Sequence, residues 1–394
     1  MGGTAMKNIY AQFFFDPAWR QSSMPNPHTW RTASYSQDKK NVAEQEEIFK
    51  KKLEKQGFPI HSICEKFNQE FAPPPPKQAS GWPGSYGVRD MISVALGSPE
   101  PRWTDGNWWH EREHYPLSAD MKKSDIDGLA VTDWGKIPEV GNMLTSRRSW
   151  LAEHPGDSPS LVGAFQYFIP GHGYGLFIGY PSFVDLGVYL MGMTEFLTLL
   201  ALDPDMADHF MNKCFELSTS YIDFLLKEQP ETFGILGGFG GDTTCMLSPD
   251  LYTRFGSAWD RRLLSHVRGK HGIPDDLPCN LHSCGVSNHL YANWSVHPCR
   301  ENIAIMQTRL IPGTVGELRK SLPQAYLELT IHPPQFDLTR ASHEGIKKIL
   351  ETSMGDATEN TILKLYFVAT DENALEQTMQ AMKTSADTLR ACLS

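Results

Sequence analysis

Residues 233–252 read FGILGGFGGDTTCMLSPDLY, and this stretch combines a strand, a turn and the start of a helix. Phe233 to Leu236 form a short apolar run, which predicts a strand. Four glycines at positions 237–241 follow, and glycine lets a backbone adopt positive φ or approach a ligand closely. Asp242 ends the turn. Ser248-Pro249 then predicts a helix start, because serine caps helices and proline suits their first turn.

The same order of strand, polar turn and helix recurs after about residue 150. Cys279 to Leu281 predict the next strand, which ends in His282-Ser283-Cys284-Gly285. Further strands are expected at 161–169, 302–307, 325–330 and 362–368, with helices at 194–202, 206–227, 314–320, 341–353 and 372–392. Alternating strands and helices predict repeated βα units. We therefore expect an α/β fold, a (β/α)8 TIM barrel, which needs about 250 residues and tolerates long insertions.

The N-terminal part does not follow this pattern. Residues 1–40 predict an arm, 41–56 a charged helix, and the four prolines from Pro73 an extended connector. A tryptophan-rich stretch follows, and it is either a lid over the active site or an insertion that packs on the scaffold. We expect residues 1–115 to form this arm, helix and aromatic-rich insertion packed on the barrel, and residues 116–394 to form the barrel itself.

Composition limits the classes of function. The net charge of −10 disfavours nucleic-acid binding, which needs a basic patch. No apolar run reaches the roughly 18 residues of a membrane span, and the N-terminus does not resemble a signal peptide, so we expect a cytoplasmic protein. The seven scattered cysteines favour reduced thiols, which bind metal or are simply buried, over disulfides.

Polar side chains follow the predicted strands, where a barrel has its catalytic rim. His282 and Cys284 are two residues apart on extended backbone, so their side chains point the same way. An imidazole nitrogen and a thiolate sulfur form half of a zinc site. Structural burial, or a catalytic histidine without metal, would also explain the pair. Asp242 is a further candidate beside them, or else only the cap of its turn.

Other residues are candidates for a small-molecule pocket. His332 follows strand 325–330 and is a third metal ligand, a general acid or a loop residue. His172 and Tyr174 lie in a loop rich in glycine and aromatic residues, which suits either a mostly apolar pocket or an exposed surface. Gln307 and Arg309, at the end of strand 302–307, are candidate substrate-binding residues, and Arg309 could hold a carboxylate.

Two motifs together resemble the uroporphyrinogen decarboxylase superfamily. Residues 240–252, GGDTTCMLSPDLY, contain an aspartate-bearing turn and an L-S-P helix start. About thirty residues later, residues 280–285, NLHSCG, contain an H-x-C-G strand end. Residues 202–205 resemble the family's D-P-D/E segment and residues 371–373 its terminal E-N helix opening. The resemblance covers roughly 155–390 and implies the same barrel fold.

Within the superfamily, the sequence is more similar to the corrinoid-dependent methyltransferases than to the true decarboxylases. The true decarboxylases carry an R-Q-A-G-R motif near the N-terminus, and this sequence has none. The methyltransferase branch often binds zinc through H-x-C and a distant cysteine near the last strand. His282 and Cys284 match the first two ligands, but residues 366–370 contain no cysteine. Asp242 or His332 would have to complete the set, unless the metal has been lost.

The resemblance implies transfer of a methyl group between a small methylated substrate and a partner corrinoid protein, a thiol or tetrahydrofolate. Zinc would act as a Lewis acid, and without it His282 would be a general acid oriented by Asp242. The alternative is a decarboxylase or other lyase acting on a small carboxylic acid, with Asp242 and His282 as acid–base groups. A non-catalytic binding protein is the third class, which the polar rim residues disfavour. Homodimerisation is left open.

Overall fold

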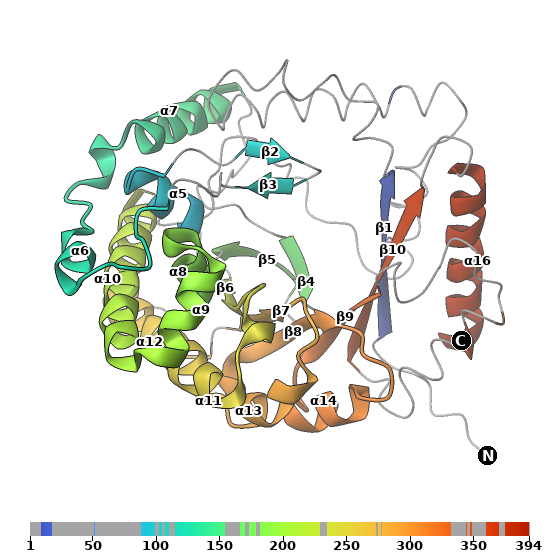
Figure 1. Ribbon diagram of the computed structural model, residues 1–394. Coiled ribbons are helices and arrows are strands. Elements are labelled where there is room, and N and C mark those ends of the chain that lie inside the picture. Colours follow the sequence, from blue (N-terminus) through green and yellow to red (C-terminus); the bar gives the residue numbers. More distant parts are fainter. Residues whose placement is uncertain are drawn as a thin grey trace. The chain divides into compact units, whose positions relative to one another are not determined.

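The structure is a computed structural model (Figure 1), and it describes residues 9–17, 51, 88–98, 102–104, 107–109, 115–153, 166–169, 173–178, 182–228, 235–272, 275–276, 278–331, 344, 347–348, 360–369 and 375–393. The described residues fall into two compact units. The smaller unit contains those up to 51 and from 305 onward. The larger unit contains those from 88 to 304.

Parallel strands form the sheet of the smaller unit. In order across the sheet these are β1 (Ile9–Pro17), β10 (Thr361–Ala369), β9 (Tyr326–Ile331) and β8 (Ile303–Arg309). Helix α14 (Val315–Ser321) connects β8 to β9, and α16 (Leu375–Leu393) packs against β1 and β10 (Figure 1). The β8-α14-β9 segment is therefore a βα unit of the predicted kind.

Strand β1 corrects one expectation. Residues 1–40 were predicted to form an arm packed on the outside of the barrel, yet Ile9–Pro17 pair with β10 along the whole strand. The sequence IYAQFFF explains this, because isoleucine, tyrosine and phenylalanine favour strands. The division of the chain at residue 115 stays a prediction, and the two compact units follow different boundaries.

The larger unit has a mixed sheet. Strand β4 (Gln166–Ile169) pairs antiparallel with β5 (Gly173–Ile178), which pairs parallel with β6 (Ile235–Gly240), and β6 pairs parallel with β7 (Cys279–Ser283). Tyr174 was predicted to lie in a loop and instead lies in β5. Gly173 and Gly175 made this segment look irregular, but its pairing with two neighbouring strands determines the conformation.

Helices surround this sheet. They are α5 (Val88–Ala95), α6 (Lys123–Gly128), α7 (Pro138–Glu153), α8 (Phe183–Met191), α9 (Met193–Leu202), α10 (Pro204–Glu228), α11 (Pro249–Leu251), α12 (Ala258–His271) and α13 (Tyr291–Ser295). Short helical turns are η2 (Trp134–Lys136), η3 (Thr244–Met246), η4 (Tyr252–Ser257), η5 (Asn288–Leu290) and η6 (Arg300–Asn302), and β2 (Arg102–Thr104) forms a hairpin with β3 (Asn107–Trp109).

The long helix α10 is the centre of the helical layer in the larger unit. It contacts α5, α6, α8, α9 and α12, and it buries Phe210, Tyr221 and Ile222 completely. The helix begins at Pro204, two residues before the predicted start at residue 206; Asp203 precedes it, and its carboxylate accepts a hydrogen bond from the Met206 amide at 3.1 Å. Packing of α5 and α8 against α10 fixes two helices whose residues reach the site described below.

Most predicted elements after residue 190 are confirmed. The strands expected at 279–281, 302–307, 325–330 and 362–368 are present, with ends that differ by one or two residues. Parallel strands joined by helices confirm the α/β class, whereas closure into a (β/α)8 barrel stays a prediction. The helices expected at 41–56 and 341–353 lie almost entirely outside the described residues.

No single described helix is long and apolar enough to cross a membrane. Among the described helices, only α8 and α9 taken together have the length and apolar composition of such a span, and the chain bends by 117° between them.

Candidate functional site

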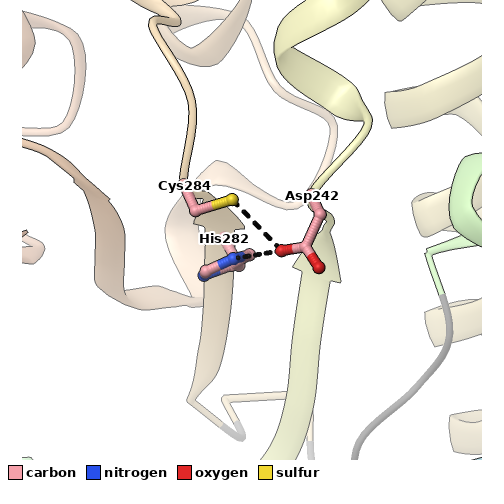
Figure 2. Close-up of side chains that lie close together, drawn as sticks. All are labelled: Asp242, His282 and Cys284. Atoms are coloured by element: carbon pink, nitrogen blue, oxygen red, sulfur yellow. Dashed lines mark hydrogen bonds and ion pairs between the residues drawn. The ribbon is translucent and has the colours of Figure 1, made fainter. Parts of the chain in front are cut away.

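The register of two parallel strands brings Asp242 next to His282. Gly240 of β6 lies opposite His282 of β7, and the Gly241 amide donates a hydrogen bond to the His282 carbonyl oxygen at 2.9 Å. Asp242 follows directly, so its side chain lies at the carboxyl end of the strand pair, beside the end of β7 (Figure 2). The carboxyl ends of parallel strands are where α/β proteins place their sites.

The side chains of His282 and Cys284 converge on one carboxylate oxygen of Asp242 (Figure 2). His282 Nε2 lies 3.0 Å from Asp242 Oδ1, and Cys284 Sγ donates to the same oxygen at 3.2 Å. Both contacts confirm that the two-residue spacing directs His282 and Cys284 to the same side. The Asp242 side chain is 60% exposed and that of His282 34%, so a small molecule can reach the cluster.

The contacts determine the protonation of the cluster. The hydrogen bond from His282 lowers the pKa of Asp242 far below its ordinary value, against a smaller opposing effect of burial, and Arg89 and Cys284 add to the lowering. Burial and the negative charge of Asp242 raise the pKa of the Cys284 thiol to about 12. At neutral pH the cluster therefore contains an ionised carboxylate that accepts from a neutral thiol.

Glycines let the two loops approach this closely. Gly240 has a φ of +73°, and a Cβ at this position would lie 2.2 Å from the His282 carbonyl oxygen. A Cβ at Gly285 would lie 2.2 Å from Cys245 Sγ, so the loops after β6 and β7 touch at this point. The expectation that the glycine-rich turn serves positive φ and close approach is confirmed at Gly240.

Sequence reasoning missed two residues that contact this loop. The Asp185 carboxylate, from the first turn of α8, accepts hydrogen bonds from the amides of Asp242 and Thr243 at 3.1 and 2.9 Å. Arg89 of α5 places Nη1 3.4 Å from Asp185 Oδ2 and 4.0 Å from Asp242 Oδ2. Asp185 had a signal, as a lone carboxylate within the apolar run FVDLGVYLM, whereas the neighbours of Arg89 in sequence gave none.

The remaining candidates are distributed elsewhere. Gln307 is buried in the smaller unit and donates to Glu328 Oε1 at 2.7 Å, while Arg309, on the same strand, is half-buried. Tyr174 lies in β5, opposite Phe168. His172 and His332 lie outside the described residues, so their roles in substrate and metal binding stay predictions, as do those of Gln307, Arg309 and Tyr174.

The cluster has the composition of a metal site. Asp242, His282 and Cys284 each offer one ligand atom, and these atoms all lie within 4.8 Å of one another. One nitrogen, one sulfur and one oxygen donor suit zinc, which accepts all three. These residues therefore fit the metal that the family resemblance implies, with Asp242 in place of the missing cysteine.

One family model matches the segment that contains the cluster. Residues 179–301, which contain α8, β6, β7 and the cluster, match the family model described as Uroporphyrinogen decarboxylase (URO-D). Among solved structures, a methyltransferase from Methanosarcina mazei aligns with a TM-score of 0.48 and 13% sequence identity, over 77% of this chain and 79% of that one. None of the curated proteins compared with the sequence matches it. The match over residues 179–301 confirms that this chain is similar to the URO-D superfamily, as its aspartate-bearing turn and H-x-C-G strand end predicted.

Proposed function

We propose that the protein is a metal-assisted methyltransferase. In this proposal Asp242, His282 and Cys284 hold zinc, and a methyl group moves between a small methylated substrate and a corrinoid protein, a thiol or tetrahydrofolate. The observation that carries the proposal is the convergence of a carboxylate, an imidazole and a thiol within 4.8 Å at the open end of two parallel strands. Bound there, the metal would supply a Lewis acid that polarises the heteroatom bearing the methyl group.

The state of Cys284 favours a ligand over a nucleophile. A thiol whose pKa is about 12 is almost entirely protonated near neutral pH, and the thiolate is the reactive form. The Cys284 thiol donates to Asp242 Oδ1, so its proton lies between the sulfur and the oxygen that would both bind the metal. A divalent cation would displace this proton, which is the usual behaviour of cysteine ligands.

Two features of the site need no metal. Asp242 stays ionised and accepts from His282, which fixes the orientation of the imidazole. Met246 and Val286 follow the touching residues Cys245 and Gly285, and both are more than half exposed. These exposed apolar side chains lie within four residues of Asp242 and Cys284 in the sequence, and apolar surface with a few polar groups is the usual composition of a small-molecule site.

The contact between Asp242 and His282 supports a second candidate function. At 3.0 Å, the pair could deliver a proton to a carbanion, as a decarboxylase or other lyase acting on a small carboxylic acid requires. Such an enzyme also needs a cation for the carboxylate. Arg89 lies near Asp242, but it contacts the buried Asp185 more closely. Methyl transfer therefore fits the described residues better.

Elemental mass spectrometry of the purified protein tests the proposal. We expect about one zinc per chain, lost in both His282→Ala and Cys284→Ala. His209→Ala is the matched control, because His209 pairs with Asp127 on the surface, and it should keep the metal. Protein purified without chelator that contains no metal would refute the zinc mechanism.

Activity panels then separate the two candidate functions. Methylated amines, ethers and thioethers are offered with cob(I)alamin, a thiol or tetrahydrofolate as acceptor, and small carboxylic acids are offered alone. Zinc-dependent demethylation supports the methyltransferase. Release of CO2, abolished in His282→Ala and independent of zinc, would support the lyase.

A further inference from the structure

We propose that Asp185 is a positioning residue that holds the Asp242 carboxylate in its place, and that Arg89 completes this support. The proposal deepens the proposed function, and only its metal-binding test rests on that function. Asp185 lies on α8 and Arg89 on α5, so neither belongs to the strand ends that carry Asp242, His282 and Cys284.

The two hydrogen bonds to Asp185 flank the Cα atom of Asp242. One oxygen of Asp185 accepts from the amide of Asp242, and the other accepts from the amide of Thr243. Fixing the peptide units on both sides of one Cα fixes φ and ψ of that residue, and therefore the direction in which its Cα–Cβ bond points. Burial raises the pKa of the Asp185 carboxyl, whereas the Arg89 guanidinium and the hydrogen bond from Thr243 lower it. In its ionised form Asp185 accepts stronger hydrogen bonds than a neutral group would.

Asp185 is itself held rigidly. Its side chain is 6% exposed, and its amide donates to Ser182 Oγ at 3.3 Å in the first turn of α8. The loop packs against this turn without spare room, because a Cβ at Gly241 would lie 2.1 Å from Asp185 Oδ2 and 2.6 Å from the Ser182 Cβ. A rigid acceptor in a fixed helix can determine where the loop lies.

Arg89 divides the two oxygens of Asp242 between two tasks. Oδ1 contacts His282 and Cys284, whereas Oδ2 faces the Arg89 guanidinium at 4.0 Å. The same guanidinium lies 3.4 Å from Asp185 and 4.6 Å from the centre of the Tyr189 ring. The cation thus offsets the repulsion between two neighbouring carboxylates, one of which is buried, and buried charges need such a partner.

A purely structural role for Asp185 makes a different prediction. A buried carboxylate that only stabilises the packing of helix α8 would affect the stability of the larger unit as a whole. A positioning residue also affects the order of one loop and the affinity of the site at the end of that loop. Replacing a residue that hydrogen-bonds a metal ligand, but does not touch the metal itself, typically weakens metal affinity by about 10–100-fold.

The experiment compares full-length wild-type protein with Asp185→Asn and Arg89→Met. Asparagine keeps the shape but replaces one acceptor by a donor, which opposes one of the two amides. Asp223→Asn is the matched control: Asp223 is also largely buried and accepts from His266, Lys270 and His271, on the α10 and α12 side of the unit. Urea unfolding checks that each variant is folded.

Two measurements decide the matter. The first is hydrogen–deuterium exchange of peptides spanning residues 240–246 without metal, where we expect about tenfold faster exchange in Asp185→Asn and unchanged exchange in Asp223→Asn. The second is Co²⁺ titration followed by its visible absorption, where the dissociation constant should rise about 10–100-fold in Asp185→Asn, with an altered band shape, and less in Arg89→Met.

The outcomes separate the two proposals. Faster exchange confined to residues 240–246 supports the positioning role. Unchanged exchange there, or a uniform increase across the larger unit, would overturn it. Wild-type protein that binds no Co²⁺ would overturn the metal site of the proposed function, and the exchange data alone would then decide the role of Asp185.

Discussion

Gly240→Ala should destabilise the protein by about 2–5 kcal/mol, in two separable parts. The first is conformational, because a φ of +73° costs a residue with a Cβ about 1–2 kcal/mol. The second is steric: the new Cβ would lie 2.2 Å from the His282 carbonyl oxygen, and only movement of β6 away from β7 relieves this overlap. Overpacking of this kind typically costs about 1–3 kcal/mol.

The assay is urea unfolding at 25 °C, with stability taken from the midpoint and the slope of the transition. Gly269→Ala is the matched control, since a Cβ on this residue of α12 meets no atom within 4 Å. It should stabilise the protein by about 0.5–1 kcal/mol, because alanine favours a helix over glycine. If Gly240→Ala unfolds at the wild-type midpoint, the close packing of β6 on β7 at this residue does not exist in solution.

Three further predictions concern other buried or coordinating groups. Zinc affinity should rise about tenfold per pH unit between about pH 7.5 and 9.5, because the Cys284 thiol, with a pKa of about 12, must release one proton on binding. Calorimetry in two buffers measures that proton, and a binding enthalpy that does not depend on the buffer would contradict its release. His297→Ala should destabilise the protein by about 3–5 kcal/mol, because the buried Asp260, 4% exposed, loses the imidazole 3.3 Å away. A fall in the free energy of unfolding of less than about 1 kcal/mol, measured in urea, would contradict this. Lys364→Met should lower the melting temperature, because the buried Glu328, 1% exposed, loses its cation. Adding Glu328→Gln should restore part of the lost melting temperature. If it restores none, the unpaired charge of Glu328 is not the cause.

The fold was predictable where local signals were strong. Helix α10 has a cap and a proline at its start, and its apolar residues recur with helical spacing. Strand β7 stands between polar segments and is short and mostly buried. Strand β1 contains residues that favour strands, but its partner β10 lies near the other end of the chain, and β5 contains glycines. Which strands these two segments pair with depends on contacts that no local window contains.

The site was predictable to the same extent. The spacing of His282 and Cys284 directed both side chains to one side, and the turn after β6 brought Asp242 to them. Asp185 and Arg89 are linked to one another across 96 residues of sequence, and Asp185 contacts the Asp242 amide across 57. Contacts of this length come from helix packing, so the sequence offers no periodicity or motif that reveals them.

Arg89 lies outside the segment of the chain that carries the rest of the site. The segment that matches the family model spans residues 179–301, and it contains Asp185, Asp242, His282 and Cys284. Arg89, on α5, lies before it. The segment 179–301 therefore does not contain every charged group of the site, because the cation that faces the Asp242 carboxylate comes from α5. A match to the family model therefore does not by itself predict which charge faces the Asp242 carboxylate, because Arg89 lies outside the matched residues.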